Sequence, residues 1–510
     1  MLARVQSYLL QGIDALLCEV EIDHDETAID ARPVVVGLPD AAVKESVERV
    51  RSAMANSGYA SPLGRIVINL APAHLRKEGP VYDLPIAVGL LGVQGVLPPV
   101  TRDGEGLDPR TLLFAGELAL DGRVRPVAGV IALASLAAKR GARGIVVPAD
   151  NAAEAAVVEG IEVYGVRTMA EVVGLLTGAL EPNPVPRANV STMLREAPAP
   201  IDFAEVRGQE AVKRAIVVAA AGGHNLLMLG PPGTGKTMMA KALPGVLPPL
   251  SPDEAVEVTR IYSAAGQLQP GQGLITSRPV RSPHHTASTP AIVGGGIVPR
   301  PGEISLAHHG VLFLDELPEF PRDVLEALRQ PLEDHVVTIA RSHAAVRFPA
   351  SFMLVAAMNP TPKGDMPPGE IGRRAMDKYM ERLSGPLLDR IDIHVEAPGV
   401  PWKQLSQAPV GTSTAQMRAQ VGGARGRQAA RQGIKPNARL SGKELDALAG
   451  LSDDAMALLG RAMGELSLSA RAYDKIRRVA RTIADIAGEA SIGPEHVAEA
   501  VGYRLLDRKV

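Results

Sequence analysis

One octapeptide constrains the fold of this chain more than any other segment. A glycine-rich loop alone could be a simple turn between a strand and a helix, but an added lysine and threonine favour a phosphate-binding loop, whose backbone N–H groups converge on a polyphosphate. The octapeptide follows the mostly apolar run 225–229, so a strand, a loop and a helix are predicted in that order. Its residues are Gly230, Pro231, Pro232, Gly233, Thr234, Gly235, Lys236 and Thr237.

A second segment supplies the carboxylates that such a loop needs for hydrolysis. The apolar run 311–314 ends in Asp315 and Glu316. Two acids at a strand end are more often solvated than catalytic, and only their partnership with the loop changes this interpretation. We expect Thr237 and Asp315 to hold Mg²⁺ and Glu316 to polarise the attacking water, because phosphoryl transfer depends mostly on positioning and charge stabilisation. Together with Lys236, which can reach the β and γ phosphates, these residues predict an ATPase that uses ATP and Mg²⁺.

Composition excludes several classes of protein. A chain of 510 residues exceeds the size of a single hydrophobic core, so two or three domains are expected. A formal net charge of -2 excludes a uniformly basic nucleic-acid-coating protein, and any DNA contact must come from local arginine and lysine clusters. The single cysteine, Cys18, suits a reducing cytoplasm. The sequence shows no long apolar signal segment and no run of membrane-spanning length, so a cytoplasmic protein without a membrane partner is expected.

Shifts in composition predict the domain organisation. Residues 1–180 have the pattern of a mixed α/β domain, and prolines crowd the following segment, 181–200, which is predicted to be a linker. The nucleotide-binding core is expected over 201–400. Residues 401–440 are polar and arginine-rich with Gly-Gly and Arg-Gly breaks, which favours a connector, and 441–510 has the helical pattern of a lid.

Local patterns predict some elements of these domains. In the first domain, strands are expected at 65–70, 112–114 and 144–147, and helices at 40–56 and 130–140. In the last domain, apolar residues recur in steps of four and three, which marks one buried helical face. These residues are Ala472, Ile476, Val479, Ile483 and Ile486.

Further segments resemble the ComM/YifB family of magnesium-chelatase-like AAA+ ATPases. The resemblance covers essentially the whole chain, and it is specific because the segments occur in the family's order. It implies an α/β fold with an N-terminal Lon-protease-like (ribosomal S5-like) domain, an AAA+ P-loop core and a small C-terminal helical lid. The segments are 281–286, 299–308, 312–320, 356–360, 387–392 and 468–473.

The resemblance implies roles for three more residues. Asn359 is similar to the sensor-one residue, whose amide orients the hydrolytic water, although an isolated Asn-Pro pair would more simply start a turn. Arg390 resembles an arginine finger that enters a neighbouring subunit's γ-phosphate site, the alternative being a surface salt bridge to Asp389 or Asp392. Arg471 resembles the sensor-two arginine of the lid, the alternative being a solvated helix face. A finger acting on a neighbour implies a homo-oligomer, and a closed hexameric ring is the expected form.

Candidate DNA contacts lie on two further segments. The resemblance suggests an insertion within 272–300 and a hairpin with strands at 336–340 and 346–348 before the sensor-one strand, which is expected at 352–358. In related ring motors such hairpins point into the central channel, where arginines contact phosphates without reading bases. Solvated hairpin tips explain these arginines nearly as well. The candidates are Arg278, Arg281, Arg300, Arg341 and Arg347.

Four histidines invite a metal hypothesis. No cysteine and no regular ligand spacing accompany them, so hydrogen-bonded structural histidines are the favoured interpretation. They are His284, His285, His308 and His309.

A Lon-like domain joined to an AAA+ core raises the alternative of a protease. Lon-type chemistry needs a serine activated by a lysine. The stretch after Gly79 and Pro80 offers no serine, and Ile131 stands where the lysine would be expected. We therefore interpret this domain as a retired peptidase fold that serves ring assembly or contacts with DNA or protein.

These inferences favour an ATP-driven hexameric DNA motor. As the resemblance implies, it would act on branched or single-stranded DNA and promote branch migration of recombination intermediates during natural transformation. The main alternative is a magnesium-chelatase-type ATPase that remodels a protein partner. An ATP-dependent protease and a nucleotide-gated scaffold are further alternatives.

Overall fold

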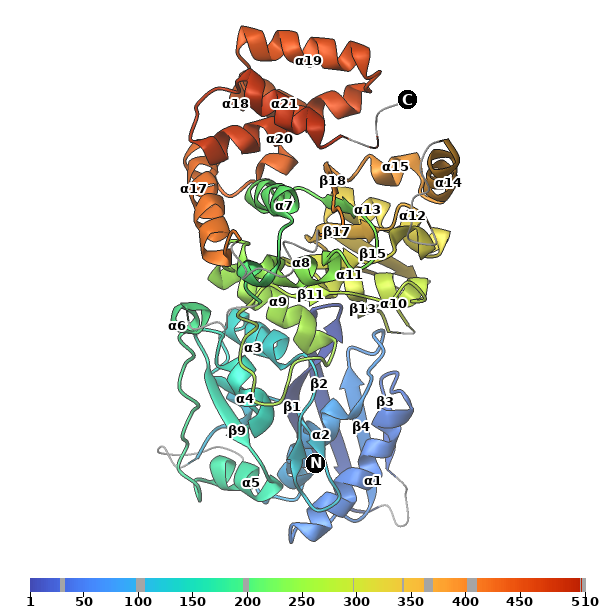
Figure 1. The fold of residues 1–510 in the computed structure, drawn as a ribbon. Helices are drawn as coiled ribbons and strands as arrows, with labels where there is room; N and C mark the ends of the chain where they lie inside the picture. The colour runs from blue at the N-terminus through green and yellow to red at the C-terminus, as the bar shows by residue number, and fades with distance from the viewer. Residues whose placement is uncertain are drawn as a thin grey trace. The chain divides into compact units, whose positions relative to one another are not determined.

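The fold divides into two compact units along the chain (Figure 1). Unit 1 comprises Met1–Glu196 and Ser251–Thr276, and unit 2 comprises Ala197–Leu250 and Ser277–Val510. Unit 1 therefore takes up a segment, 251–276, that the sequence placed within the nucleotide-binding core. The computed structural model describes residues 1–27, 33–97, 106–195, 201–296, 298–341, 344–361, 370–400, 411–504 and 506.

Unit 1 is built on a mixed sheet with the strand order β3-β4-β2-β1-β5-β8-β9. β1 and β2 form an antiparallel hairpin. On its other edge β1 pairs in parallel with β5, and β5 with β8 and β8 with β9 are parallel as well. The predicted strands at 65–70, 112–114 and 144–147 are confirmed as β4, β5 and β8. The strands of unit 1 are β1 (Leu2–Gln11), β2 (Asp14–Asp25), β3 (Val34–Val36), β4 (Arg65–Ala71), β5 (Leu112–Phe114), β6 (Glu117–Leu118), β7 (Val124–Arg125), β8 (Gly144–Pro148) and β9 (Glu162–Val166).

Helices cover both faces of this sheet. Apolar residues of α1, α2 and α5 share one hydrophobic cluster with the sheet, and those of α3 and α4 share another. The predicted helices at 40–56 and 130–140 are confirmed as α1 and α3. The helices of unit 1 are α1 (Ala41–Asn56), α2 (Asp83–Val93), α3 (Val130–Lys139), α4 (Ala149–Ala155), α5 (Met169–Thr177), α6 (Val190–Arg195) and α9 (Pro252–Ala264).

Polar contacts explain why α9 belongs to unit 1. The helix begins at a capping box formed by Ser251 and Glu254. Near its other end, Ser263 Oγ donates to Oε2 of Glu154 at 2.5 Å, and the N–H of Gly129 donates to the Ser263 carbonyl at 3.1 Å. Burial raises the pKa of Glu154, which is only 2% exposed, and hydrogen bonds from Ser263 and Asn151 oppose that rise. A hydroxyl inserted against a buried carboxyl thus fastens α9 to α3 and α4.

Unit 2 is built on a parallel sheet with the order β11-β14-β17-β10-β18. β14 and β17 are buried along their whole length, as expected for parallel strands covered on both faces. Because the carboxyl ends of parallel strands meet at one edge, the loops after β10, β14 and β17 lie side by side. The strands of this sheet are β10 (Leu226–Leu229), β11 (Val280–Arg281), β14 (Val311–Leu314), β17 (Met353–Met358) and β18 (Ile393–Glu396).

Two hairpins lie outside this sheet. β12 (Gly294–Gly295) pairs with β13 (Arg300–Pro301), within the segment where an insertion was expected. β15 (Val336–Arg341) pairs with β16 (Ala344–Pro349), which confirms the predicted hairpin before β17. Residues 342–343 of its turn lie outside the described residues.

Within the segment 401–440, which was expected to be a connector, residues 414–432 form the helix α17. Its buried residues, Met417, Val421, Ala424 and Gln428, follow steps of four, three and four, and the helix packs against α7 and α20. This packing outweighs the cost of two adjacent glycines, about 1 kcal/mol each. The helices of unit 2 are α7 (Glu210–Gly222), α8 (Lys236–Ala242), α10 (Thr289–Val293), α11 (Glu303–Leu306), α12 (Arg322–Ala327), α13 (Arg329–Asp334), α14 (Glu370–Met380), α15 (Gly385–Leu388), α17 (Thr414–Gln432), α18 (Gly442–Leu448), α19 (Asp453–Glu465), α20 (Ala470–Ala487) and α21 (Pro494–Gly502).

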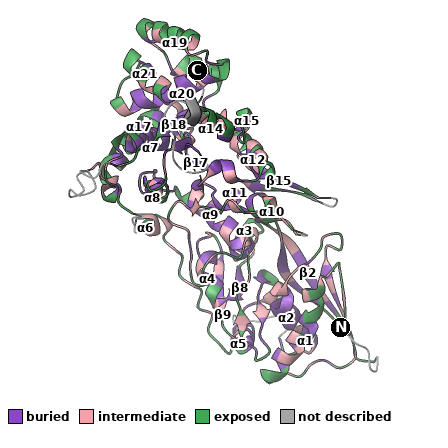
Figure 2. Ribbon diagram, turned by 45° about the vertical axis from the view of Figure 1, so that its right-hand side comes forward, coloured by how far each residue is buried: buried purple, intermediate pink, exposed green. Residues whose placement is uncertain are grey.

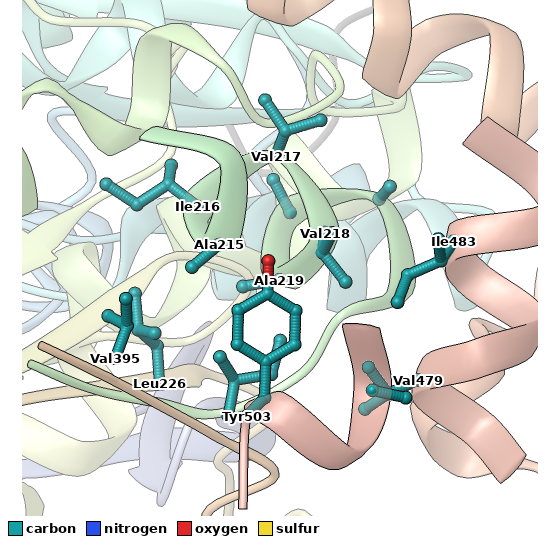
Figure 3. Packing of buried hydrophobic residues seen from close by; sticks show 14 of the residues in the cluster. Ala215, Ile216, Val217, Val218, Ala219, Leu226, Val395, Val479, Ile483 and Tyr503 are labelled. Carbon is teal, nitrogen blue, oxygen red and sulfur yellow. The ribbon is translucent and has the colours of Figure 1, made fainter. Parts of the chain in front are cut away.

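One hydrophobic cluster joins the sheet of unit 2 to the C-terminal helices. Val218 of α7, Leu226 of β10 and Val395 of β18 share it with Val479 and Ile483 of α20 (Figure 3). The predicted apolar face of α20 is confirmed, with four of its residues buried and Ile486 partly buried. By contrast, α19 is exposed over most of its surface (Figure 2). Among the described residues, no helix is both long and apolar enough to cross a membrane.

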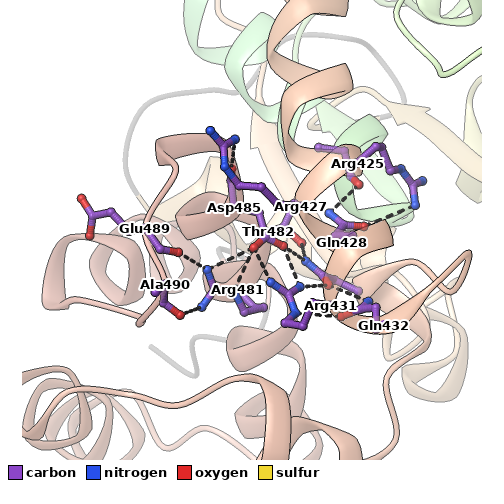
Figure 4. A network of polar contacts seen from close by, with 12 residues as sticks. Arg425, Arg427, Gln428, Arg431, Gln432, Arg481, Thr482, Asp485, Glu489 and Ala490 are labelled. Atoms are coloured by element: carbon purple, nitrogen blue, oxygen red, sulfur yellow. Dashed lines mark hydrogen bonds and ion pairs between the residues drawn. The ribbon is translucent and has the colours of Figure 1, made fainter.

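A buried polar network fastens α17 to α20 (Figure 4). The carboxylate of Asp485, which is 1% exposed, accepts two hydrogen bonds from Arg431, at 2.6 and 2.9 Å. It also accepts hydrogen bonds from Arg481 at 3.2 Å and from Asn437 at 2.8 Å. A buried carboxylate with this many donors remains compatible with the apolar core around it.

Candidate nucleotide-binding site

The glycine-rich loop connects β10 to α8, so that strand, loop and helix follow one another as predicted. Gly233 and Gly235 have φ angles of +79° and +86°, in the left-handed region that glycine adopts with little strain. Gly230 packs against Ala397, the residue that follows β18. A Cβ at position 230 would lie 2.1 Å from the carbonyl oxygen of Ala397, which leaves room for glycine alone. The loop therefore depends on glycine for conformation at two positions and for space at a third.

Lys236 is held at the centre of the loop. Its Nζ donates to the carbonyl oxygens of Gly230 at 2.6 Å and Pro231 at 2.8 Å, and to Oδ1 of Asn359 at 3.2 Å. Burial lowers the pKa of Lys236, and the charge of Asp315 opposes this. The structure thus brings Lys236, which follows β10, into contact with Asn359 at the end of β17.

Thr237 and Asp315 meet in the same place. The Thr237 Oγ1 donates to Oδ2 of Asp315 at 2.8 Å, and Oδ1 of Asp315 accepts the N–H of Glu316 at 3.0 Å. A hydroxyl and a carboxylate oxygen are the hard ligands that Mg²⁺ prefers. With the glycine cradle and an ammonium group beside them, these residues fit a magnesium nucleotide. Thr237 and Asp315 would hold the ion, and the loop with Lys236 would hold the phosphates.

Glu316 has an unexpected neighbour. Its Oε2 lies 3.1 Å from Nδ1 of His285, and its backbone has a φ of +52°, which is uncommon for a residue other than glycine. The ring of His285 packs edge-on against Phe320, with centroids 6.4 Å apart. The sequence favoured a structural histidine at this position, because no cysteine and no regular metal-ligand spacing accompany it, and it gave no signal for a contact with Glu316. The partly exposed Glu316 carboxylate is nonetheless oriented by this contact.

The two predicted arginines make their contacts elsewhere in the chain. Arg390 pairs with Glu333 and donates to the carbonyl oxygen of Pro386. Its partner is thus neither of the two aspartates considered from the sequence. Arg471 has a side chain that is 74% exposed, and its Nη1 lies 3.0 Å from Oδ2 of Asp389. The role of Arg390 as a finger in a neighbouring subunit's site and that of Arg471 as the sensor-two arginine of the lid stay predictions.

The candidate DNA-binding arginines fall into two groups. Arg278 donates to the carbonyl oxygens of Pro248 and His309, both at 2.6 Å, and Arg281 forms a two-pronged pair with Glu303. Both arginines therefore hydrogen-bond to other residues of unit 2 and stabilise its fold. The remaining two with described side chains, Arg300 of β13 and Arg347 of β16, are exposed. The side chain of Arg341 lies outside the described residues.

Comparison with known proteins settles the family. Residues 202–405 match the family of the magnesium chelatase subunit ChlI, 411–504 match the C-terminal part of that subunit, and 19–151 match a further ChlI family. The competence protein ComM of Haemophilus influenzae is 44% identical over 514 residues, which cover 99% of this chain and 98% of that protein. The chain belongs to the ComM/YifB family of magnesium-chelatase-like AAA+ proteins. The resemblance stated from the sequence is therefore confirmed.

Other members and relatives of the ComM/YifB family differ in how much of the chain they match. The uncharacterized protein YifB of Escherichia coli is 47% identical over 481 residues, covering 93% of this chain and 92% of that protein. The magnesium-chelatase 38 kDa subunit of Rhodobacter capsulatus is 28% identical over 190 residues, covering 34% of this chain and 53% of that subunit. Similarity to the ComM/YifB proteins thus extends over both units, whereas similarity to the chelatase subunit covers about a third of the chain.

In this ComM/YifB-family chain, the position predicted for a peptidase lysine is apolar and enclosed. The side chain of Ile131 is fully buried in α3, and its N–H lies 3.4 Å from Oε2 of Glu154. A buried aliphatic side chain cannot activate a nucleophile. The interpretation of unit 1 as a fold without peptidase activity stays a prediction, which assays for peptide products would test.

Proposed function

We propose that this protein hydrolyses ATP at the site formed by the loop 230–237, Asp315, Glu316 and Asn359. We further propose that a hexameric ring of it uses this hydrolysis to drive branch migration of DNA. The observation that carries the first proposal is the pair of contacts that joins three strand ends: Thr237 to Asp315 and Lys236 to Asn359. In a parallel sheet this edge is where ligands bind.

The proposed chemistry assigns one task to each group. Loop N–H groups and Lys236 hold the phosphates, and the ammonium exchanges carbonyl partners for phosphate oxygens when nucleotide binds. Bound Mg²⁺ would neutralise negative charge on the phosphate oxygens. Glu316 accepts the proton of the attacking water, and the Asn359 amide orients that water. Arg390 of a neighbouring subunit stabilises the charge that develops on the γ-phosphoryl group.

Two substitutions test this chemistry. Lys236→Ala should abolish binding of a fluorescent ATP analogue, because it removes the cation that faces the phosphates. Glu316→Gln should keep that binding but lower ATP turnover by about 100-fold or more, since the amide cannot accept a proton. Wild-type turnover in Glu316→Gln would show that another group acts as the base.

Similarity to a protein named competence protein ComM, at 44% identity over nearly the whole chain, supports DNA as the partner. Exposed Arg300 and Arg347 on separate hairpins offer phosphate contacts without base recognition. We propose a cytoplasmic location, which the buried, unpaired Cys18 supports. Strand exchange on synthetic three-way and four-way junctions should require ATP, fail with a non-hydrolysable analogue, and fail with Glu316→Gln.

A second candidate is a chelatase-type ATPase that remodels a protein partner. The match to the magnesium-chelatase 38 kDa subunit favours it over part of the chain. Branched DNA should raise ATP turnover if the protein is a DNA motor and leave it unchanged if the partner is a protein. Unchanged turnover, together with no strand exchange, would favour the second candidate.

A further inference from the structure

We propose that Asn225 is a positioning residue for Arg390. The inference rests on the proposed function, in which Arg390 completes the site of a neighbouring subunit. Asn225 directly precedes β10, so it lies at the opposite end of that strand from the glycine-rich loop. Its side chain joins two segments that the mechanism uses, β17 with Asn359 at its end and the segment 389–393 with Arg390.

The side-chain amide of Asn225 makes one bond in each direction. Its Oδ1 accepts the N–H of Leu354 in β17 at 2.9 Å, and its Nδ2 donates to the carbonyl oxygen of Arg390 at 2.8 Å. The backbone carbonyl of Asn225 accepts the N–H groups of Asp392 and Ile393, both at 3.1 Å. The side-chain amide is therefore fixed by the sheet and hydrogen-bonds directly to the main chain of Arg390.

The next two residues are held by Lys475 of α20 and by Arg504, which follows α21. The carbonyl oxygen of Ile391 accepts from Arg504 at 2.7 Å and from Lys475 at 3.2 Å, and that of Asp392 accepts from Arg504 at 3.1 Å. Successive carbonyl groups from 390 to 392 are thus bonded to two different parts of unit 2. The hydrogen bond from Asn225 is the one that ties the carbonyl of Arg390 to the sheet.

His224 reinforces this arrangement beside Asn225. Its buried ring places Nδ1 3.4 Å from Oδ2 of Asp392 and Nε2 2.8 Å from Oγ1 of Thr482 in α20. Although burial would raise the pKa of Asp392, the hydrogen bond from His224 and the charge of Lys475 lower it to about 2, so the carboxylate stays ionised. Thr482 also belongs to the network between α17 and α20 (Figure 4). Asn225 therefore lies where the sheet, the Arg390 segment and the helical lid meet.

A change of one atom separates the two bonds of Asn225. Asn225→Asp keeps an oxygen for the N–H of Leu354 but loses the N–H that Arg390 accepts. Because the guanidinium follows its backbone, we expect kcat to fall by about 10- to 100-fold. The KM for ATP should stay within about twofold, since no loop residue is touched. Asn225→Ala removes both bonds without adding charge, and it serves as the second variant should Asn225→Asp fail to fold.

Mixing experiments show in which subunit the defect acts. In a ring where each site combines one subunit's loop with the next subunit's Arg390, Lys236→Ala lacks the loop cation but offers an intact finger. Mixing it with the Asn225 variant should restore turnover well above the sum of the two alone. Mixing the Asn225 variant with Arg390→Ala should restore nothing, because both lack a working finger.

The opposite pattern would overturn the proposal. If the Asn225 variant damaged its own site, Arg390→Ala would rescue it and Lys236→Ala would not. Unchanged kcat in the folded variant would overturn it as well. The mixture of Lys236→Ala with Arg390→Ala tests the proposed function separately. Absence of rescue in that control would contradict the finger role of Arg390, whatever Asn225 does.

Discussion

At the scale of single residues, Gly230 and Gly233 serve the same loop for different physical reasons. Gly230 leaves room for the Ala397 carbonyl, whereas a Cβ at Gly233 would meet no described atom within 4 Å, and the constraint there is a φ of +79°. Gly230→Ala should destabilise unit 2 by about 1–3 kcal/mol through overpacking. Gly233→Ala should cost about 1–2 kcal/mol through backbone strain. Urea denaturation and ATP affinity measure both effects.

Asparagine at each position provides the control. It tolerates the left-handed region better than alanine, so Gly233→Asn should recover part of the loss seen with Gly233→Ala. Gly230→Asn should be at least as damaging as Gly230→Ala, because the backbone carbonyl of Ala397 cannot move aside easily. Equal recovery at both positions would contradict the distinction between space and conformation.

Residue patterns identified the groups at the strand ends better than their partners across the fold. Thr237 and Asp315 were expected to lie together because Thr237 ends the glycine-rich loop and Asp315 directly follows an apolar strand, and both segments have strong local signatures. The Thr237 Oγ1 and the Asp315 Oδ2 lie 2.8 Å apart. The contact of His285 with Glu316 and that of Arg390 with Glu333 had no such signal. Both depend on how loops from distant segments fold over the sheet, which local periodicity does not encode.

At the scale of elements, strands and amphipathic helices were predictable where apolar spacing was regular, as in β4, β8 and α20. The helix α17 was not, because its glycines and arginines favoured a connector. Its stability comes from packing on α7 and α20 and from the network around Asp485. The attachment of α9 to unit 1 likewise depends on a buried hydroxyl-carboxyl contact between segments far apart in sequence.

The network around Asp485 makes a testable prediction for these helices. Asp485→Ala leaves Arg481, itself 1% exposed, without its buried carboxylate, so unit 2 should lose about 3–5 kcal/mol. Arg382→Ala is the control, since Arg382 pairs with Glu319 at 2.7 Å but its side chain is 52% exposed, and the loss should stay below about 1 kcal/mol. Chemical denaturation gives the stabilities, and hydrogen exchange should increase in α17 and α20 for Asp485→Ala alone. Similar losses in the two variants would show that the network does not stabilise the helices.

At the scale of the whole molecule, the proposed site lacks its arginine finger in one chain, because Arg390 pairs with Glu333 and not with the loop. A site that a neighbour completes makes ATP turnover depend on assembly. Turnover per subunit should therefore fall on dilution and rise to a plateau as rings form, while light scattering follows the mass in parallel. Glu316→Gln with ATP should hold the ring together longest, because bound nucleotide is not consumed. Arg390→Ala should show low turnover at every concentration, although its rings still form. Full turnover in a monomer at saturating ATP and DNA would contradict both the shared site and the ring-shaped motor that depends on it.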